Sequence, residues 1–135
     1  MLLLAGQSLQ TQTNYLKNEK ETQELSQKVV SLFEKNKISE SFEQLTLYWP
    51  LPKNEIESLE EKTMKYMNII EERLGKPIGI LKVKNETISD IALRETYLIR
   101  YEYTAIRIIF TYYKNNNGWL VNSFKWDDSF NEEFE

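Results

Sequence analysis

The sequence has 135 residues and contains no cysteine and no histidine. The absence of cysteine excludes disulfides, thiolate zinc sites and thiol nucleophiles. The absence of histidine removes the commonest general base and the commonest transition-metal ligand, so a Ser-His-Asp or Cys-His mechanism is excluded for this chain alone. Carboxylates can still bind Ca²⁺ or Mg²⁺, but no acidic, glycine-containing loop of the calcium-binding type is present. We therefore expect no cofactor and no metal site, and we assign no catalytic residue.

Long apolar runs and an excess of positive charge are also missing. No segment approaches the ~18 apolar residues of a membrane-spanning helix, so we expect no membrane span. The net charge is −4, and lysine and arginine are scattered among glutamates, which makes nucleic acid a poor candidate for a partner. What the chain does contain is 41% hydrophobic and 13% aromatic residues, enough for the core of one domain.

The N-terminus resembles the end of a secretory signal. The apolar run Leu2–Ala5 leads into the small residues Gly6 and Ser8, which suits a signal cleavage site. The run is shorter than the ~7–15 residues of a complete signal, and no basic residue precedes it. We interpret residues 1–20 as a signal remnant or flexible lead-in. We expect a secreted or periplasmic protein, with a frayed cytoplasmic N-terminus as the alternative.

Helical periodicity follows the lead-in. A helix over residues 21–35 is predicted by four apolar residues that share one stripe, Leu25, Val29, Leu32 and Phe33. A short helix over residues 42–48 is predicted by the capping-box spacing of Ser41 and Gln44. The following Trp49-Pro50 ends it, because proline disfavours helix in the residue before it.

The strongest predicted helix spans residues 55–74. Its apolar residues recur at every third or fourth position, and acidic residues crowd its first turns. Asn54 is expected to cap its start, with Glu57 at the capping-box position. Gly75 is expected to stop it, and Pro77 follows soon after.

After Pro77 the period changes to two, which is typical of strands. We predict strands over residues 78–83, 94–103, 105–113 and 119–126, with turn-like residues at 85–87 and a hairpin turn at 115–118. The predicted fold class is α+β, with two or three N-terminal helices packed on a curved antiparallel sheet of about four strands, forming a cone. We assign residues 21–128 to this single domain and residues 129–135 to an acidic tail.

Strand alternation assigns side chains to the two faces of the sheet. Glu95, Tyr97 and Tyr101 share one face, while Arg94 and Arg100 take the other. Bulky groups occur on both faces, whereas the helices can cover only one. We therefore expect the uncovered face to meet a pocket or a partner.

The order of helices and strands resembles the nuclear-transport-factor-two-like superfamily, a cystatin-related cone. Four segments carry the resemblance, which covers roughly Glu21–Asp128: Arg73–Gly79, Arg94-x-x-Tyr97, Tyr112–Lys114 and Gly118–Phe124. The chain is most similar to small exported bacterial members of unassigned function. The resemblance implies a curved sheet closed by helices into a cone with an open mouth. Superfamily members include isomerases and dehydratases for small apolar molecules, accessory subunits and non-enzymatic binding modules, and the fold does not choose among these roles.

The candidate ligand-binding residues are the aromatic side chains of the last strands, one tryptophan between helices and two strand arginines: Trp49, Arg94, Tyr97, Tyr101, Arg107, Tyr112, Trp119 and Trp126. A cluster of guanidinium groups, with Arg100 beside them, suits an anionic ligand. The alternative for the arginines is ordinary charge pairing with Glu95, Glu102 or helix carboxylates. The alternative for Trp49 is a core plug between helices.

Three functions stay open at this point. The first, which we favour, is a non-enzymatic exported module that holds a small molecule or a peptide in a cone-shaped pocket. The second is an accessory or inhibitor subunit that binds a protein through the aromatic sheet face, which would also allow a homodimer through the sheet. The third is a cofactor-free isomerase or dehydratase with Glu95 as its base, since a carboxylate in an apolar cavity suits proton abstraction.

Overall fold

The computed structural model describes residues 14–134. Three helices precede a four-stranded sheet and a short C-terminal 3-10 helix, so the predicted α+β class is confirmed. The elements in chain order are α2 (Glu19–Glu34), α3 (Ile38–Thr46), α4 (Lys53–Leu74), β1 (Pro77–Ile88), β2 (Ala92–Tyr101), β3 (Ala105–Asn115), β4 (Gly118–Asp127) and η1 (Phe130–Glu133). The residues on which the secretory-signal interpretation depends, Leu2–Ser8, lie outside the described part of the chain.

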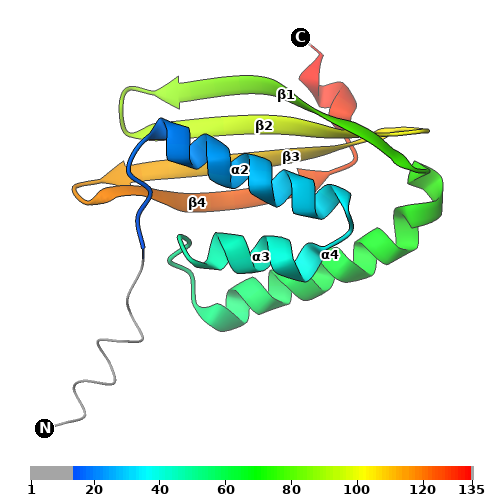
Figure 1. Cartoon of the computed structure of the whole chain (residues 1–135), viewed down its shortest axis with the longest axis horizontal. Coiled ribbons are helices and arrows are strands. Elements are labelled where there is room, and N and C mark those ends of the chain that lie inside the picture. Colours follow the sequence, from blue (N-terminus) through cyan, green and yellow to red (C-terminus); the bar gives the residue numbers. More distant parts are fainter. Residues whose placement is uncertain (1–13, 135) are drawn as a thin grey trace, which may run out of the picture.

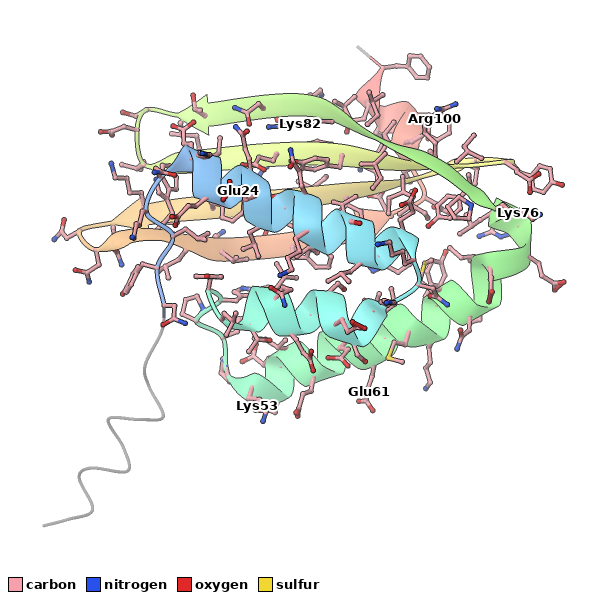
Figure 2. All side chains as sticks on the ribbon, in the orientation of Figure 1. Glu24, Lys53, Glu61, Lys76, Lys82 and Arg100 are labelled. Carbon is pink, nitrogen blue, oxygen red and sulfur yellow. The ribbon has the colours of Figure 1, made fainter. Side chains whose placement is uncertain are left out.

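The sheet is an antiparallel meander with strand order β1-β2-β3-β4, so chain order and spatial order are the same. Figure 1 shows α2 lying along one face of this sheet, with α3 and α4 continuing the helical layer beyond β4. The 3-10 helix η1 lies on the opposite side of the sheet from α2. Exposed charged residues such as Glu24, Lys53 and Glu61 lie on the solvent-facing sides of α2 and α4 (Figure 2).

The helices begin earlier than their sequence signals indicate. Asn18 caps α2, because its side-chain oxygen accepts a hydrogen bond from the Glu21 amide at 3.0 Å. Ser41 does not cap α3; it lies inside the helix, and its hydroxyl donates to the Ile38 carbonyl at 2.7 Å. The cap predicted at Asn54 is wrong as well, because α4 starts after Pro52 without a side-chain cap. Proline supplies a fixed φ that suits the entry to a helix.

Strand β1 runs through the residues expected to form a turn. Asn85, Glu86 and Thr87 each pair with a residue of β2, and the chain reverses only two residues after Thr87, where Ser89 adopts a φ of 50°. The polar residues reflect the position of β1 at the edge of the sheet, where side chains are solvated. The polar character of residues 85–87 therefore reflects their exposure to solvent in an edge strand and does not indicate a turn.

The face of the sheet toward α2, which we call the inner face, holds nearly all of the strand aromatics. Directly paired residues of antiparallel strands point to the same side, so Tyr97 with Ile108 and Phe110 with Phe124 lie on this face together. The outer face carries threonine, arginine and aliphatic residues, and Tyr113 is its aromatic residue among the described strands. Bulky groups therefore occur on both faces, but the aromatic ones lie under the helical layer, with Tyr113 as the exception.

Gly75 ends α4 with a φ of 79°, a conformation that residues with a Cβ avoid. A Cβ at this position would lie 2.8 Å from the Cβ of Glu102, in the chain segment that follows β2. The glycine thus lets the end of the long helix approach the β2–β3 turn.

We expect Gly75→Ala to lower the free energy of unfolding by about 1–3 kcal/mol, because it adds both backbone strain and a clash. Urea denaturation measures the change. Ser58→Ala, at an exposed site within α4, is the control and should change stability by less than about 0.5 kcal/mol. An equal effect of the two substitutions would contradict this role of Gly75.

Candidate functional site

A buried carboxylate lies at the centre of the inner face. Glu95 on β2 has no solvent exposure, and its Oε2 accepts a hydrogen bond from the Thr22 hydroxyl of α2 at 2.8 Å. Its Oε1 lies 3.4 Å from the hydroxyl of Tyr97, which donates to it. Burying a charged or polar group is costly unless it is hydrogen-bonded. These bonds therefore fix α2 against the sheet.

A second set of hydrogen bonds joins α2 to β3, and we call these bonds and those of Glu95 together the polar seam. The Tyr112 hydroxyl donates to the Thr22 carbonyl oxygen at 3.1 Å and accepts from the Ser26 hydroxyl at 2.6 Å. Burial raises the pKa of Tyr112 well above its ordinary value, and it raises the pKa of Tyr97 with a further contribution from the Glu95 carboxylate. Both phenols therefore act as neutral hydrogen-bond donors. Their hydroxyl groups are satisfied within the seam, which holds α2 on the sheet.

The six aromatic candidates all lie in this interior or at its margins. Tyr97 and Tyr112 expose 1% or less of their surface, and burial raises the pKa of Tyr101 to about 12, with Glu34 adding to the shift. Trp49, between α3 and α4, packs edge-on against Phe124 with ring centroids 6.5 Å apart. The structure thus brings the aromatic candidates together as core.

The two tryptophans of β4 close the ends of this core. Trp119 is buried, and its backbone exchanges hydrogen bonds of 2.8 and 2.9 Å with Leu16, just before α2. Trp126 is half-buried and donates from Nε1 to the Thr63 hydroxyl of α4 at 3.1 Å, with Tyr66 tilted over its ring. Trp119 thus joins the segment before α2 to the sheet, and Trp126 joins α4 to it.

The two arginine candidates lie on the outer face, so the structure separates them from the aromatic ones. Arg107 forms a bidentate pair with Asp127, through bonds of 3.1 and 2.7 Å. It also pairs with Glu132 at 2.9 Å and with Glu133 at 2.8 Å, both in η1. Its charge pairing involves Asp127 of β4 and the 3-10 helix η1, rather than Glu95, Glu102 or the carboxylates of the α-helices. The acidic tail is consequently attached to the sheet.

The charges around Arg107 stabilise one another. The bond to Asp127 is the main reason that the pKa of Arg107 is raised. Partial burial alone would raise the pKa of Asp127, but bonds from Arg107 and the Ser129 amide outweigh it, so this pKa is lowered. The bond from Arg107 lowers the pKa of Glu133 against an opposing effect of burial, and Lys84 adds to the lowering.

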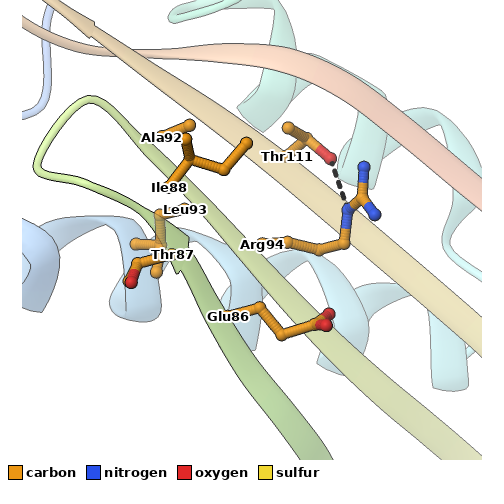
Figure 3. Close-up of a pocket in the computed structure, with 7 residues that line it drawn as sticks. All are labelled: Glu86, Thr87, Ile88, Ala92, Leu93, Arg94 and Thr111. Carbon is orange, nitrogen blue, oxygen red and sulfur yellow. Dashed lines mark hydrogen bonds between the residues drawn. The ribbon is translucent and has the colours of Figure 1, made fainter.

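Arg94 is placed differently, beside a hollow of about 190 Å³ on the outer face that we call the Arg94 hollow. It is lined by residues of the β1–β2 hairpin and one residue of β3: Glu86, Thr87, Ile88, Ala92, Leu93, Arg94 and Thr111. Nε of Arg94 donates to the Thr111 hydroxyl at 3.3 Å (Figure 3). Glu86 is directly opposite Arg94 in the strand pairing, yet the guanidinium turns toward Thr111 (Figure 3).

Sequence reasoning missed several residues that these arrangements use. Thr22 and Ser26 stand four residues apart on the same side of α2 as its apolar stripe, which was a readable signal for a buried polar contact. Glu86 and Thr111 gave no such signal, because their meeting at Arg94 depends on the register of three strands.

Comparison with protein-family models, curated proteins and solved structures finds no match to this chain. Within residues 14–134, none of the helices has the length and apolar character needed to cross a membrane. The same residues hold no group of three acidic side chains arranged to bind a metal ion. The structure by itself shows an α+β domain in which the space between the helices and the sheet is filled by core side chains.

We expect Glu95→Ala to lower the free energy of unfolding by about 2–4 kcal/mol, because it leaves a cavity and removes the acceptor for Thr22 and Tyr97. Chemical denaturation is the measurement. Glu24→Gln, on the exposed side of α2, serves as the control and should stay within about 0.5 kcal/mol of the parent. A parent-like stability for Glu95→Ala would contradict the anchoring role.

The lowered pKa values of Asp127 and Glu133 predict a dependence of stability on pH. Their contribution is present above the ordinary carboxyl pKa of about 4 and is lost as pH falls through the lowered values. Arg107→Gln should therefore flatten the loss of stability between about pH 5 and pH 2. Arg73→Gln, which breaks an exposed pair with Asp128 of 3.5 Å, should leave that slope unchanged. Parallel slopes for the parent and Arg107→Gln would refute the prediction.

Proposed function

We propose that this chain is a non-enzymatic binding module whose ligand occupies the Arg94 hollow. One observation carries the proposal. Nε is the only nitrogen of Arg94 that forms a hydrogen bond within the described residues, and no carboxylate there lies within ion-pair distance of it. The terminal nitrogens of the guanidinium are therefore free to donate two parallel bonds to a carboxylate, the arrangement that makes such pairs strong.

The other walls of the hollow narrow the class of ligand. Glu86 offers a carboxylate in the same hollow as the Arg94 cation, while Ile88 and Ala92 offer apolar surface. A ligand with a carboxylate, an ammonium group and a small apolar side chain would complement all three. The volume of about 190 Å³ suits a molecule of that size. We therefore infer that the ligand is a small zwitterion of the amino-acid type.

The packed core between the helices and the sheet disfavours a ligand site in a cone-shaped pocket there. Glu95, Tyr97, Phe110 and Tyr112 expose 1% or less of their surface, so a ligand among them would have to displace core side chains. The same burial separates the Glu95 carboxylate from any substrate in solution, which disfavours the isomerase or dehydratase hypothesis.

Membership of the nuclear-transport-factor-two-like superfamily and export from the cytoplasm are part of the proposal. Helices followed by an antiparallel meander support the first, together with the Gly118–Phe124 segment in β4. The apolar run Leu2–Ala5 followed by small residues supports the second.

An accessory or inhibitor role is the second candidate function. Three exposed apolar side chains lie at or near the Arg94 hollow: Ile88, which lines it, at 68% exposure, and Ile91 at 46% and Tyr113 at 47%. The Lys114 amide donates to the Ile91 carbonyl at 2.8 Å, which holds the β1–β2 turn against the end of β3. Such a patch suits a protein partner or a second copy of the chain through the outer face.

Three related ligands test the first proposal. Leucine carries both charges, 4-methylpentanoate lacks the ammonium group, and leucinol lacks the carboxylate. We expect leucine to shift the amide resonances of Arg94 and Thr111 in nuclear magnetic resonance titrations and to bind more tightly than the other two. Arg94→Gln should weaken leucine binding by at least about tenfold, because it removes the bidentate donor.

Arg100→Gln is the matched control, since Arg100 is an exposed arginine on the same face of β2 but outside the hollow. It should bind leucine as the parent does. Equal affinity of the three ligands, or equal weakening by the two substitutions, would rule out the Arg94 hollow as the binding site.

A further inference from the structure

A second concave surface lies between α4 and the edge of the sheet, and we call it the β4 groove. Its volume is about 420 Å³, and it is lined by Phe42, Leu59, Lys62, Thr63, Tyr66, Phe124, Lys125, Trp126 and Asp127. Four of these residues are consecutive in β4, although their side chains alternate between the inner and outer faces. What they share is the backbone edge of the strand, which therefore forms one wall of the groove.

The pairing of β4 determines which backbone groups point into this groove. β4 is the last strand of the sheet, so its far edge has no neighbouring strand. Trp119 uses its N–H and its carbonyl to bond Leu16 on that edge, and the Val121 N–H bonds the Tyr48 carbonyl there. The pairs Lys114–Trp119 and Tyr112–Val121 are therefore of the type that is not hydrogen-bonded across the two strands.

Along β3, pairs without hydrogen bonds to β4 recur at every second residue. The register shift near Tyr112 does not change this alternation, because the extra residue of the bulge, Asn122, belongs to β4. The same type then applies to Phe110–Phe124 and Ile108–Trp126. The N–H and C=O groups of Phe124 and Trp126 consequently point away from β3 and toward the groove. Within residues 14–134, these four groups form no backbone hydrogen bond outside the sheet, and this pair type gives them none to β3.

The side chains around the groove indicate what could pair with this edge. An added antiparallel strand would place two of its residues opposite Phe124 and Trp126, on the inner side, where Leu59 and Tyr66 present apolar surface that is 38% and 41% exposed. Its middle residue would lie opposite Lys125 on the outer side.

The charges around this edge are mostly positive. Lys125 and Lys62 have no ion-pair partner among the described residues, and both acidic oxygens of the nearby Asp127 are bonded to Arg107. An acidic middle residue in the added strand would therefore complement the edge.

We propose that the β4 groove binds an extended peptide segment of a partner protein, with an apolar–acidic–apolar pattern, as an added fifth strand. The chain itself already uses the first half of this edge in the same way, through Leu16 and Tyr48. The site is separate from the Arg94 hollow, so either can fail without the other.

The experiment uses the full chain labelled with ¹⁵N and an acetylated, amidated peptide of sequence Ser-Ser-Val-Glu-Val-Ser-Ser. In the free protein, the amides of Phe124 and Trp126 should exchange with solvent at least about tenfold faster than the amides of Ser123 and Lys125, which bond β3. The peptide should slow exchange at Phe124 and Trp126 alone. This alternation is the signature of strand addition.

A charge exchange provides the matched test. Lys125→Glu should weaken binding of the Val-Glu-Val peptide by about tenfold and strengthen binding of its Val-Lys-Val counterpart. Lys28→Glu, an exposed site on α2, should change neither affinity. A peptide with methylated backbone nitrogens in its central tripeptide should not bind, because it cannot donate to the strand edge.

Two results would overturn the proposal. One is slow exchange of Phe124 and Trp126 in the free protein, which would show that the chain's own first residues or a second copy already occupies the edge; a dependence on protein concentration identifies the second copy. The other is unchanged exchange at both residues at millimolar peptide.

Discussion

The seam between α2 and the inner face of the sheet is the constraint on which the rest of this structure depends. Glu95 brings a carboxylate to a position with no solvent exposure, and such a group is stable there only if its oxygens accept hydrogen bonds. Thr22 and Tyr97 provide them, while Tyr112 ties the next strand to the same turn of α2. The rotation and position of α2 on the sheet follow, because a shift of one residue would leave these groups unpaired.

The inner face of the sheet is filled by this seam and by aromatic packing. The rings of Phe33, Phe42 and Trp49 all pack on Phe124, so the helical layer and β4 close over one another. What the fold leaves accessible is the outer face, with its hollow at Arg94, and the last part of the β4 edge. Both surfaces combine apolar contact with an unpaired cation, which is a composition suited to recognition.

The two strand arginines show how the same residue type takes two roles on one face. Arg107 is surrounded by carboxylates from β4 and η1 and holds the end of the chain against the sheet. Arg94, farther along the sheet, has a threonine neighbour and free terminal donors. The difference arises from η1, which folds back over Arg107 and brings Glu132 and Glu133 to it. Arg107 is therefore paired with several carboxylates, whereas the hydrogen bond that Arg94 forms within the described residues is to a hydroxyl.

The sequence was informative wherever a pattern is local. The change of period near Pro77 separated the helical half from the sheet, the apolar steps of residues 55–74 marked the long helix, and Gly75 marked its end. It was less informative about boundaries. Ser41 and Asn54 carried cap signals that the chain does not use, and the polar residues of β1 looked like a turn because an edge strand is solvated.

The site could be predicted only in part, for a physical reason. Alternation correctly placed Glu95 with Tyr97 and Arg94 with Arg100, since the faces of a strand are fixed by its own residues. It could not say which face α2 would cover, so aromatic core residues such as Tyr97 and Tyr112 were taken as lining an open pocket. The meeting of Arg94 with Thr111, and of Arg107 with η1, depends on strand register and on the path of the tail. The sequence by itself determined the fold class and the absence of thiol and imidazole chemistry. The tertiary structure decided which cations are left unpaired, because that depends on contacts between residues far apart in the chain.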